Sequence, residues 1–225
     1  MPSSARSIAI ISLSVCSLGY AHAEEPQRRN SMVRFGAYLG GGMVDWMGKD
    51  ADGNLPGETA VVKPGFSAGL LATLDVSKLL SLRIEPFHVA AQLEFIYAAK
   101  GTELERDGAV GESSIDVNYL EAGLLLRAEY LAESAVPYVV FGPELGVLHS
   151  AELNTRFGST VDIEENLKST DLGLVLGLGT MYSLPPWGSV GLELRGDLGL
   201  VSIDGQGDGD EIRNAALTLL LVYLY

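Results

Sequence analysis

The chain has 225 residues, of which 47% are hydrophobic, and its 29 acidic side chains outnumber 15 basic ones. This length suits one domain, or at most two small ones. The acidity argues against nucleic acid as a partner, because phosphate binding needs clustered lysine and arginine.

The first 23 residues have the three parts of a secretory signal peptide. Arg6 gives a positive start, residues 8–15 are apolar, and residues 21–23 (Ala-His-Ala) form a small-x-small cleavage site. The apolar run is too short to cross a bilayer as a helix. An uncleaved anchor and lipoprotein processing at Cys16 are the two alternatives. Cleavage after residue 23 would remove Cys16, the single cysteine, and leave the mature chain without thiol chemistry.

Residues 24–32 are polar and are predicted to form a short periplasmic lead-in. From residue 33 onward, apolar and polar side chains alternate with the period of two that β-strands have. Around Glu193, for example, the neighbours Leu192 and Leu194 fall on the opposite face. The pattern predicts eight strands, each long enough to cross a bilayer at a tilt. These strands cover residues 33–43, 65–75, 87–98, 116–130, 137–148, 170–182, 187–200 and 213–225.

The connections between these strands alternate between short and long. If the first strand begins on the inner side, every short connection and both termini face the periplasm, and every long connection faces outward. This arrangement accounts for all the connections and predicts an all-β fold over residues 33–225. The predicted fold class is an eight-stranded antiparallel up-and-down transmembrane β-barrel. The short connections cover 77–86, 132–136 and 184–187, and the long, polar ones cover 44–64, 99–115, 149–169 and 201–212.

The direction of the apolar strand face separates a membrane barrel from a soluble one, whose apolar face points inward. The chain ends on an alternating apolar strand with an aromatic, Tyr225. This ending resembles the terminal signal that the outer-membrane assembly machinery reads. Aromatic side chains also fall near strand ends, as in the two interfacial girdles of membrane barrels. The girdle candidates are Trp46, Phe66, Phe87, Tyr97, Tyr130, Tyr182, Trp187 and Tyr223.

A third feature is a set of charges in the middle of the polar strand face, interspersed with glycines. An eight-stranded barrel is just wide enough for side chains to fill it, so charged groups inside it need glycines that leave room. Buried acids and arginines must pair to avoid a large desolvation cost. We therefore predict a structural charge network in the barrel interior, which Arg34 joins. Its members are Glu94, Glu121, Arg127, Glu129, Glu144, Glu193, Arg195 and Asp197.

Four stretches of strand and turn cover much of the mature chain: residues 87–102 (FHVAAQLEFIYAAKGT), 119–127 (YLEAGLLLR), 137–148 (PYVVFGPELGVL) and 171–182 (DLGLVLGLGTMY). In these stretches the sequence resembles the PorT-like family of small outer-membrane β-barrel proteins. The resemblance implies an outer-membrane barrel fold, and it carries over no catalytic residue.

Two histidines remain in the mature chain, and one of them suggests a rival function. His88 falls on the predicted inward face near Glu94. An outer-membrane lipid hydrolase would need such a histidine beside a nucleophilic serine, for which Ser67 and Ser81 are the candidates. A structural histidine is the alternative. His149 begins an outer loop and is predicted to be solvated or interfacial.

Two predicted outer loops, residues 49–54 and 204–211, are rich in aspartate and glycine. Flexible, oxygen-rich loops can bind Ca²⁺, but neither loop has the full twelve-residue calcium pattern with its terminal glutamate. Plain solvated hairpin loops are the alternative. A third acidic loop covers residues 162–171, and acids in these loops could bridge to lipopolysaccharide through divalent ions.

The leading hypothesis is an outer-membrane barrel with a structural or surface-interaction role, no catalysis and no cofactor or metal. Its expected partners are outer-membrane lipid and lipopolysaccharide, the assembly machinery, and an unidentified protein at the outer loops. A lipid-modifying enzyme centred on His88 and a small-solute channel are the two alternatives.

Overall fold

The computed structural model describes residues 31–48, 58–81, 85–106, 109–132, 135–155, 157–205 and 212–225. The predicted signal peptide, and all but the end of the predicted lead-in, lie outside these residues. In the described part of the chain, no helix is both long and apolar enough to cross a membrane.

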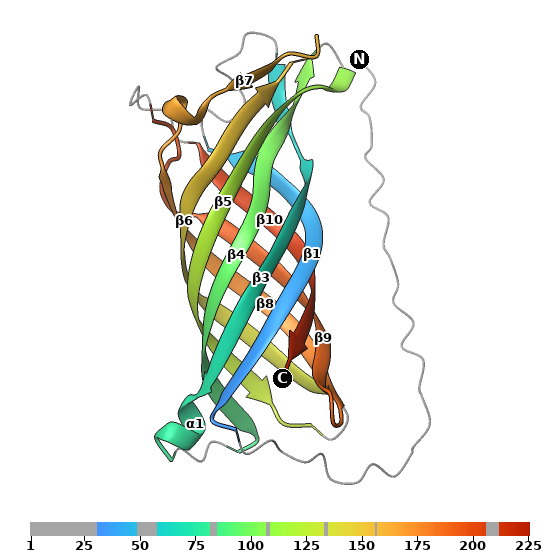
Figure 1. Ribbon diagram of the computed structural model, residues 1–225, viewed down its shortest axis with the longest axis vertical. Helices are drawn as coiled ribbons and strands as arrows, with labels where there is room; N and C mark the ends of the chain where they lie inside the picture. The colour runs from blue at the N-terminus through green and yellow to red at the C-terminus, as the bar shows by residue number, and fades with distance from the viewer. Residues whose placement is uncertain are drawn as a thin grey trace, which may run out of the picture.

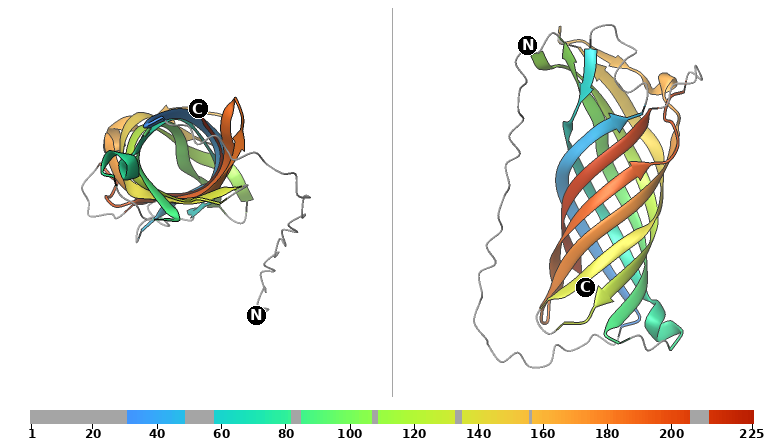
Figure 2. Two further views of the ribbon diagram at one scale, coloured as in Figure 1. Left: turned by 90° about the horizontal axis from the view of Figure 1, so that it is seen from below. Right: turned by 180° about the vertical axis from the view of Figure 1, so that it is seen from behind.

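Eight antiparallel strands close into one ring in the order β1-β3-β4-β5-β6-β8-β9-β10, and β10 pairs back with β1 (Figures 1 and 2). The predicted fold class is therefore confirmed. Two short strands, β2 and β7, lie outside the ring and pair with β4 and β6. The strands are β1 (Val33–Met47), β2 (Glu58–Val61), β3 (Lys63–Asp75), β4 (Phe87–Arg106), β5 (Ala109–Tyr130), β6 (Val136–Asn154), β7 (Thr160–Asp162), β8 (Thr170–Leu184), β9 (Gly188–Gly199) and β10 (Arg213–Leu224).

The two ends of the barrel differ in what they carry (Figure 1). One end, which we call the terminal end, holds the start of β1, the end of β10, the short helix α1 (Val76–Leu79) and the turn between β8 and β9. The opposite, hairpin end holds the tip of the β4–β5 hairpin, β7 and the 3-10 helix η1 (Glu164–Asn166). Helix α1 and the β8–β9 turn, which belong to predicted short connections, thus lie at the same end as the start of β1 and the end of β10.

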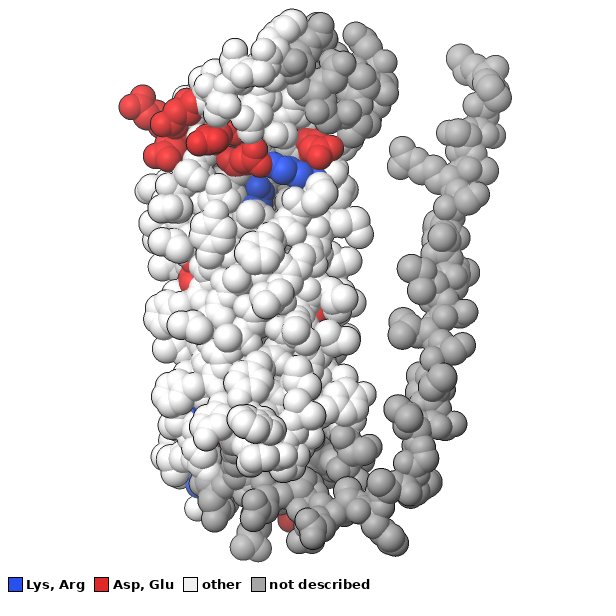
Figure 3. All heavy atoms as spheres, turned by 45° about the vertical axis from the view of Figure 1, so that its right-hand side comes forward, with Lys and Arg blue, Asp and Glu red and all other residues white. Residues whose placement is uncertain are grey.

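The outer wall of the barrel is apolar. Leu124, Leu192 and Leu194 are 59%, 52% and 49% exposed, whereas Glu193 and Arg127 are 1% and 0% exposed. On the face that Figure 3 shows, a broad uncharged band covers the wall, and charged side chains gather toward the hairpin end. The apolar faces of the strands therefore point outward, as a membrane barrel requires. Seven of the eight girdle candidates are exposed: Phe66, Phe87, Tyr97, Tyr130, Tyr182, Trp187 and Tyr223.

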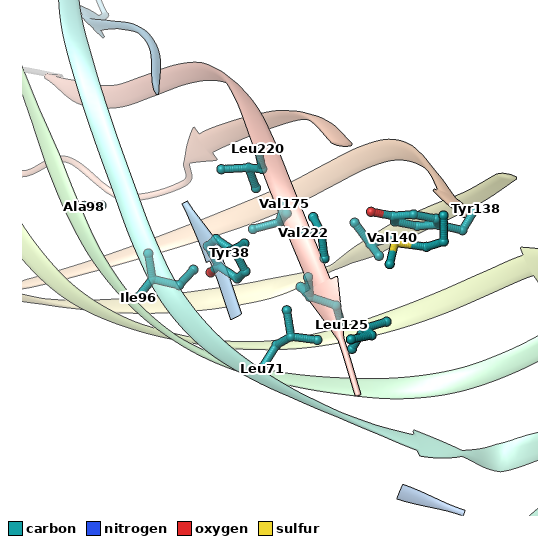
Figure 4. Packing of buried hydrophobic residues seen from close by; sticks show 12 residues of the cluster. Tyr38, Leu71, Ile96, Ala98, Leu125, Tyr138, Val140, Val175, Leu220 and Val222 are labelled. Atoms are coloured by element: carbon teal, nitrogen blue, oxygen red, sulfur yellow. The ribbon is translucent and has the colours of Figure 1, made fainter. Parts of the chain in front are cut away.

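Apolar side chains from several strands also pack inside the barrel. Tyr38 from β1, Leu125 from β5 and Val175 from β8 belong to one buried cluster (Figure 4). Leu125 had interrupted the alternation of charges on the inward face of β5, and it supplies part of this packing. The interior is therefore a filled mixture of apolar and charged groups rather than an open pore.

The prediction of a long loop over 99–115 is wrong. Strand β4 continues to Arg106 and β5 begins at Ala109, so this segment is a β-hairpin that extends the wall. Likewise, β6 continues to Asn154 and pairs there with β7. We call this extension the collar, comprising β2, residues 101–106 of β4, 109–119 of β5, 150–154 of β6, and β7.

The polarity of the strand faces inverts where the collar begins, and this inversion explains the error. On β5, Leu120 points outward and Glu121 inward, but Ile115 and Val117 point inward, buried, while Asp116 lies on the outer face. In the collar the alternation continues, but apolar side chains point inward and polar side chains point outward. The segment therefore lacked the pattern of a wall strand and was predicted to be a polar connection. The collar has its own apolar core, made of Leu104, Ile115, Val117, Tyr119 and Ala151, against which Trp46, Leu148, Leu153, Ile163 and Leu167 pack. Trp46, predicted to be a girdle residue, belongs to this core instead.

A β-bulge accommodates the inversion on β6. Tyr119 pairs with Leu148, but Asn118 pairs with Ser150, so His149 is an extra residue. Below the bulge, Val147 is exposed, and above it Ala151 is buried and Glu152 exposed. The His149 ring contacts the ring of Tyr97 edge to face, with centroids 6.5 Å apart. This contact marks the border between the apolar wall and the collar.

Candidate functional site

An arginine on β9 joins charged groups from two walls of the barrel. The Arg195 guanidinium donates two hydrogen bonds to Glu94 on β4, at 2.8 and 2.9 Å, and contacts Glu193 Oε1 at 2.7 Å. Glu193 also accepts a 2.8 Å hydrogen bond from Tyr138. Because the period of a strand is two, Glu193 and Arg195 share the inward face. A two-pronged arginine–carboxylate pair is among the strongest protein hydrogen-bonded contacts.

A second arginine, on β5, extends the same network toward the terminal end. Arg127 Nε donates to Glu129 at 2.7 Å, and Nη1 donates to Gln92 at 3.1 Å. Its guanidinium lies 3.5 Å from the centre of the Tyr138 ring. Arg34 donates to Glu129 at 2.8 Å. This terminal-side network balances three arginines with three glutamates, namely Arg34, Arg127 and Arg195 with Glu94, Glu129 and Glu193.

Glycines on β8 make room for these side chains. A Cβ at Gly179 would lie 2.4 Å from the Tyr138 ring, and one at Gly177 would lie 2.8 Å from the Glu193 carboxylate. Real Cβ atoms do not approach this closely, so larger residues would displace the Tyr138–Glu193 pair. The mixture of glycines and charges on the inward face therefore has a steric basis.

A third charged group lies nearer the hairpin end. Lys100 Nζ contacts Glu121 at 2.5 Å and Glu144 at 3.9 Å. Glu121, Glu144 and Asp197 line two small neighbouring cavities, each with room for about one water molecule; Lys100 and Asp171 line one of them, and Arg195 lines the other. We call Lys100, Glu121, Glu144, Asp171 and Asp197 the Lys100 chamber. Lys100 is the one cation among these five residues, and Arg195, which is already paired with Glu94 and Glu193, borders one of the cavities. The four carboxylates therefore outnumber the nearby cations, in contrast to the balanced network.

Polar atoms of the Lys100 chamber are left without hydrogen-bond partners among the described residues. Asp171 accepts from Asn214 Nδ2 at 2.8 Å through Oδ2, but its Oδ1 has no partner. Asp197 Oδ1, Asn214 Oδ1 and the Tyr119 hydroxyl are likewise buried and without partners. Asp171, Asn214 and Tyr119 are all almost wholly buried. Within the described part of the chain, the carboxylates of the chamber thus present buried oxygen acceptors without hydrogen-bond donors.

On the outside of the collar, three carboxylates line up across neighbouring strands. Asp116 on β5 pairs with Glu152 on β6, which pairs with Asp162 on β7. We call these residues the acidic row. Asp116 is also in contact with Lys63 and Asn154, whereas Glu152 and Asp162 are exposed. Like charges directly opposite each other on a sheet repel, so the row favours a bound cation.

The structure brings the predicted network residues together, but in two separate groups. Glu94, Arg127, Glu129, Glu193 and Arg195 lie in the terminal-side network. Glu121, Glu144 and Asp197 lie in the Lys100 chamber. Sequence reasoning missed Lys100, which it assigned to a loop, although its position six residues after Glu94 preserves the inward parity of β4. It also missed Gln92, Tyr38, Tyr138, Asp171 and Asn214.

The sequence matches the family model described as outer membrane protein beta-barrel domain, over residues 23–205. The match covers most of the chain. This chain belongs to that outer-membrane barrel family. The outer membrane is therefore its location. The PorT-like resemblance is narrower than this family, and no curated protein matches the sequence.

Several solved structures share the barrel fold at low sequence identity. The Neisserial surface protein A is 15% identical and has a TM-score of 0.47, covering 87% of this chain and 98% of its own. Ail, the attachment invasion locus protein of Yersinia pestis, is 11% identical, with a TM-score of 0.39, covering 87% and 100%. The outer membrane enzyme PagL is 12% identical, with a TM-score of 0.48, covering 84% and 98%.

His88 of this outer-membrane barrel lies near the terminal end. Its Nε2 is 3.1 Å from Asp75 Oδ2, and Asp75 Oδ1 accepts a hydrogen bond from the Lys78 amide at the start of α1. Ser67 pairs with Ala98, ten residues along β4 from His88, which corresponds to roughly 33 Å of strand. Ser67 is therefore not a nucleophile for His88. Ser81 lies in the exposed turn that follows α1.

The loops proposed to bind calcium are only partly described. Residues 49–57 and 206–211 lie outside the described residues, so both predicted calcium loops largely do as well. In the third acidic loop, Asp162 accepts a hydrogen bond from the Glu164 amide, and Asp171 points into the barrel. Within the described ranges, no group of three or more His, Cys, Asp or Glu residues could hold a metal ion by itself.

Proposed function

We propose that this barrel has a structural, surface-interaction role: it holds a rigid collar among the head groups of lipopolysaccharide and contacts their phosphates through divalent cations. The acidic row is the observation that supports this role. It lies on the outer face of the collar, directly beyond the apolar wall, at the level where lipid head groups meet the protein.

The chemistry of the acidic row suits a cation shared with a phosphate. Mg²⁺ and Ca²⁺ bind oxygen ligands, and Mg²⁺ in particular is often held by one or two carboxylates together with phosphates. The protein alone supplies no complete metal site among its described residues. Phosphate oxygens of the lipid would complete the coordination shell, so binding would require lipid and cation together.

The test compares urea unfolding of the barrel in vesicles with and without lipopolysaccharide and Mg²⁺. Wild-type protein is expected to gain stability only when both are present. The variant Glu152→Gln/Asp162→Asn should lose this gain, since both exposed acids of the row are removed. The control, Glu85→Gln/Glu165→Gln, removes the same charge at two exposed positions outside the row and should keep the gain. A gain that does not need Mg²⁺, or that survives in the row variant, would contradict the proposal.

The His88–Asp75 pair supports a second candidate, a lipid-modifying enzyme. A carboxylate that orients a histidine is part of many nucleophilic sites, and the buried Ser77 follows Asp75 by two residues. However, Ser77 Oγ accepts a hydrogen bond from the Val89 amide, and Asp75 caps α1. We therefore assign the pair a structural role. Mass analysis of outer-membrane lipid from cells with wild-type protein and with His88→Ala would separate the two roles.

A solute channel is the remaining candidate. Arg127, Glu193 and Arg195 occupy the barrel interior and join opposite walls, and the apolar cluster fills the space beside them. We expect no steady conductance in planar bilayers. A stable conductance of the wild-type barrel would favour the channel over the structural role.

A further inference from the structure

We propose that the Lys100 chamber binds a small monovalent cation, held with water between Asp171 and Asp197. This inference concerns the barrel interior and is independent of the acidic row outside. It begins from the unequal distribution of charge between the two interior groups.

The terminal-side network has an arginine for each of its carboxylates, although Arg127 Nη2 has no hydrogen-bond partner among the described residues; the Lys100 chamber has more carboxylates than cations. Each carboxylate of the network contacts at least one guanidinium group. In the chamber, Lys100 contacts Glu121 closely and Glu144 more distantly. Among the described residues, Asp171 and Asp197 have no ion pair within contact distance, although Lys100 and Arg195 line cavities together with Asp197. Burying an unpaired carboxylate in a membrane protein is costly, so a compensating positive charge is expected there.

The buried oxygen atoms without hydrogen-bond donors indicate where this positive charge would lie. Asp171 and Asp197 line the same cavity, and each has a buried Oδ1 with no hydrogen-bond partner among the described residues. Asn214 holds Asp171 Oδ2 and adds a third buried oxygen without a partner, its own Oδ1. These acceptors are oxygens, which are the ligands that hard cations prefer.

The size and ligand number of the chamber favour a monovalent ion. Each cavity has room for about one water molecule, which is also the approximate size of Na⁺ or K⁺. Calcium takes six to eight oxygen ligands, and no group of three acids in the described residues has such geometry. A monovalent ion with bound water needs fewer protein ligands and fits the space.

Lys100, Glu144 and Asp171 are almost wholly buried, so an ion has little access to the chamber from solvent once the barrel has folded. The apolar collar core, with Val117 and Tyr119 fully buried, covers its hairpin side. Arg195 and Tyr38 line the cavity on the opposite side. Any test must therefore fold the protein in the presence of the chosen cation rather than add the ion afterwards.

The experiment refolds the full mature barrel into phospholipid vesicles that contain no lipopolysaccharide, with EDTA present to remove divalent ions. One sample contains NaCl and the other contains N-methyl-D-glucamine chloride at equal ionic strength, because that organic cation is too large for the chamber. At a Na⁺ concentration about ten times its dissociation constant, the folding equilibrium constant should rise about tenfold in NaCl relative to the organic salt. Equal stability in the two salts would overturn the proposal.

Variants locate the effect. Asp171→Asn/Asp197→Asn should abolish the difference between the salts, and the surface control Glu85→Gln, which lies outside both proposed cation sites, should preserve it. Lys100→Gln removes the internal ammonium group, so it should enlarge the difference if the variant folds. A difference that persists in the double aspartate variant would place the ion elsewhere and refute the assignment.

A direct measurement uses crystals grown from protein refolded in RbCl. An anomalous scattering peak between Asp171 and Asp197 would support the site. A chamber without such a peak, occupied by water or compensated by protons alone, would refute it. Because lipopolysaccharide and divalent ions are absent throughout, failure here leaves the role proposed for the acidic row unaffected.

Discussion

The wall that faces lipid and the collar above it follow opposite rules, although the same strands build both. In the wall, apolar Leu124 points outward and Arg127 is buried. In the collar, Val117 is buried and Glu152 is exposed. The solvent outside changes from hydrocarbon to water at the border, and the side chains change with it. The comparison teaches that one continuous strand can satisfy two solvents by reversing its alternation once.

The largest effect is expected where the wall interior loses a charge. Arg195→Met should destabilise the barrel by about 3–5 kcal/mol, because Glu94 and Glu193 would remain buried without their partner. Urea unfolding in vesicles measures the loss. Adding Glu94→Gln and Glu193→Gln should recover part of it. No loss in the single variant would mean that water reaches these carboxylates.

The second largest effect is expected for an arginine on the outer surface, which should destabilise the wall more than the collar. Leu124→Arg places a charge near the middle of the apolar wall and should cost about 2–4 kcal/mol in a bilayer. The matched change Glu152→Arg lies on the collar and should stay within about 0.5 kcal/mol. Similar costs at both positions would show that the lipid boundary does not lie between them.

A small cavity in the collar core tests whether this region has a packed interior of its own. Ile115→Val should cost about 0.5–1.5 kcal/mol, since one buried methylene group is lost. Hydrogen exchange should show faster opening of the β4–β5 hairpin tip, with β9 and β10 unchanged. Uniformly faster exchange in all strands would mean that wall and collar unfold as one unit.

The smallest effect is expected at the exposed ion pair beside α1. Lys78→Ala removes a 3.3 Å contact with Asp75 and should cost about 0.2–1 kcal/mol. High salt should reduce this cost further. A larger loss in the same unfolding assay would indicate that Lys78 also positions His88 through Asp75.

The sequence was sufficient to predict the strands of the wall and their outward faces, but it was not sufficient to predict the strands of the collar. Alternation predicted which face of each wall strand points outward, because lipid and a narrow interior impose opposite polarities on neighbouring residues. This rule failed at residues 99–115, where apolar side chains change from the outer to the inner face of the strands. Lys100 was missed for this reason, since it stands at the border between the two regions.

The partners inside the barrel depended on contacts that sequence spacing does not contain. Arg195 and Glu94 are 101 residues apart, and only closure of the ring brings them together. Trp46 shows the opposite limit, because its position near a strand end suited a girdle, whereas the collar core provided a better apolar site. The alternation predicted acids and arginines in the interior, but only the geometry divided them into a balanced network and a chamber with excess carboxylates.

The bulge at His149 has a consequence for chain length in evolution. It gives β6 one residue more than its partner β5 at this point. A homologous chain that lacks one residue here could pair without a bulge and still keep Val147 outside and Ala151 inside. Elsewhere on β6, the loss of a single residue would turn the remainder of the strand inside out. Single-residue deletions among relatives should therefore concentrate at this position.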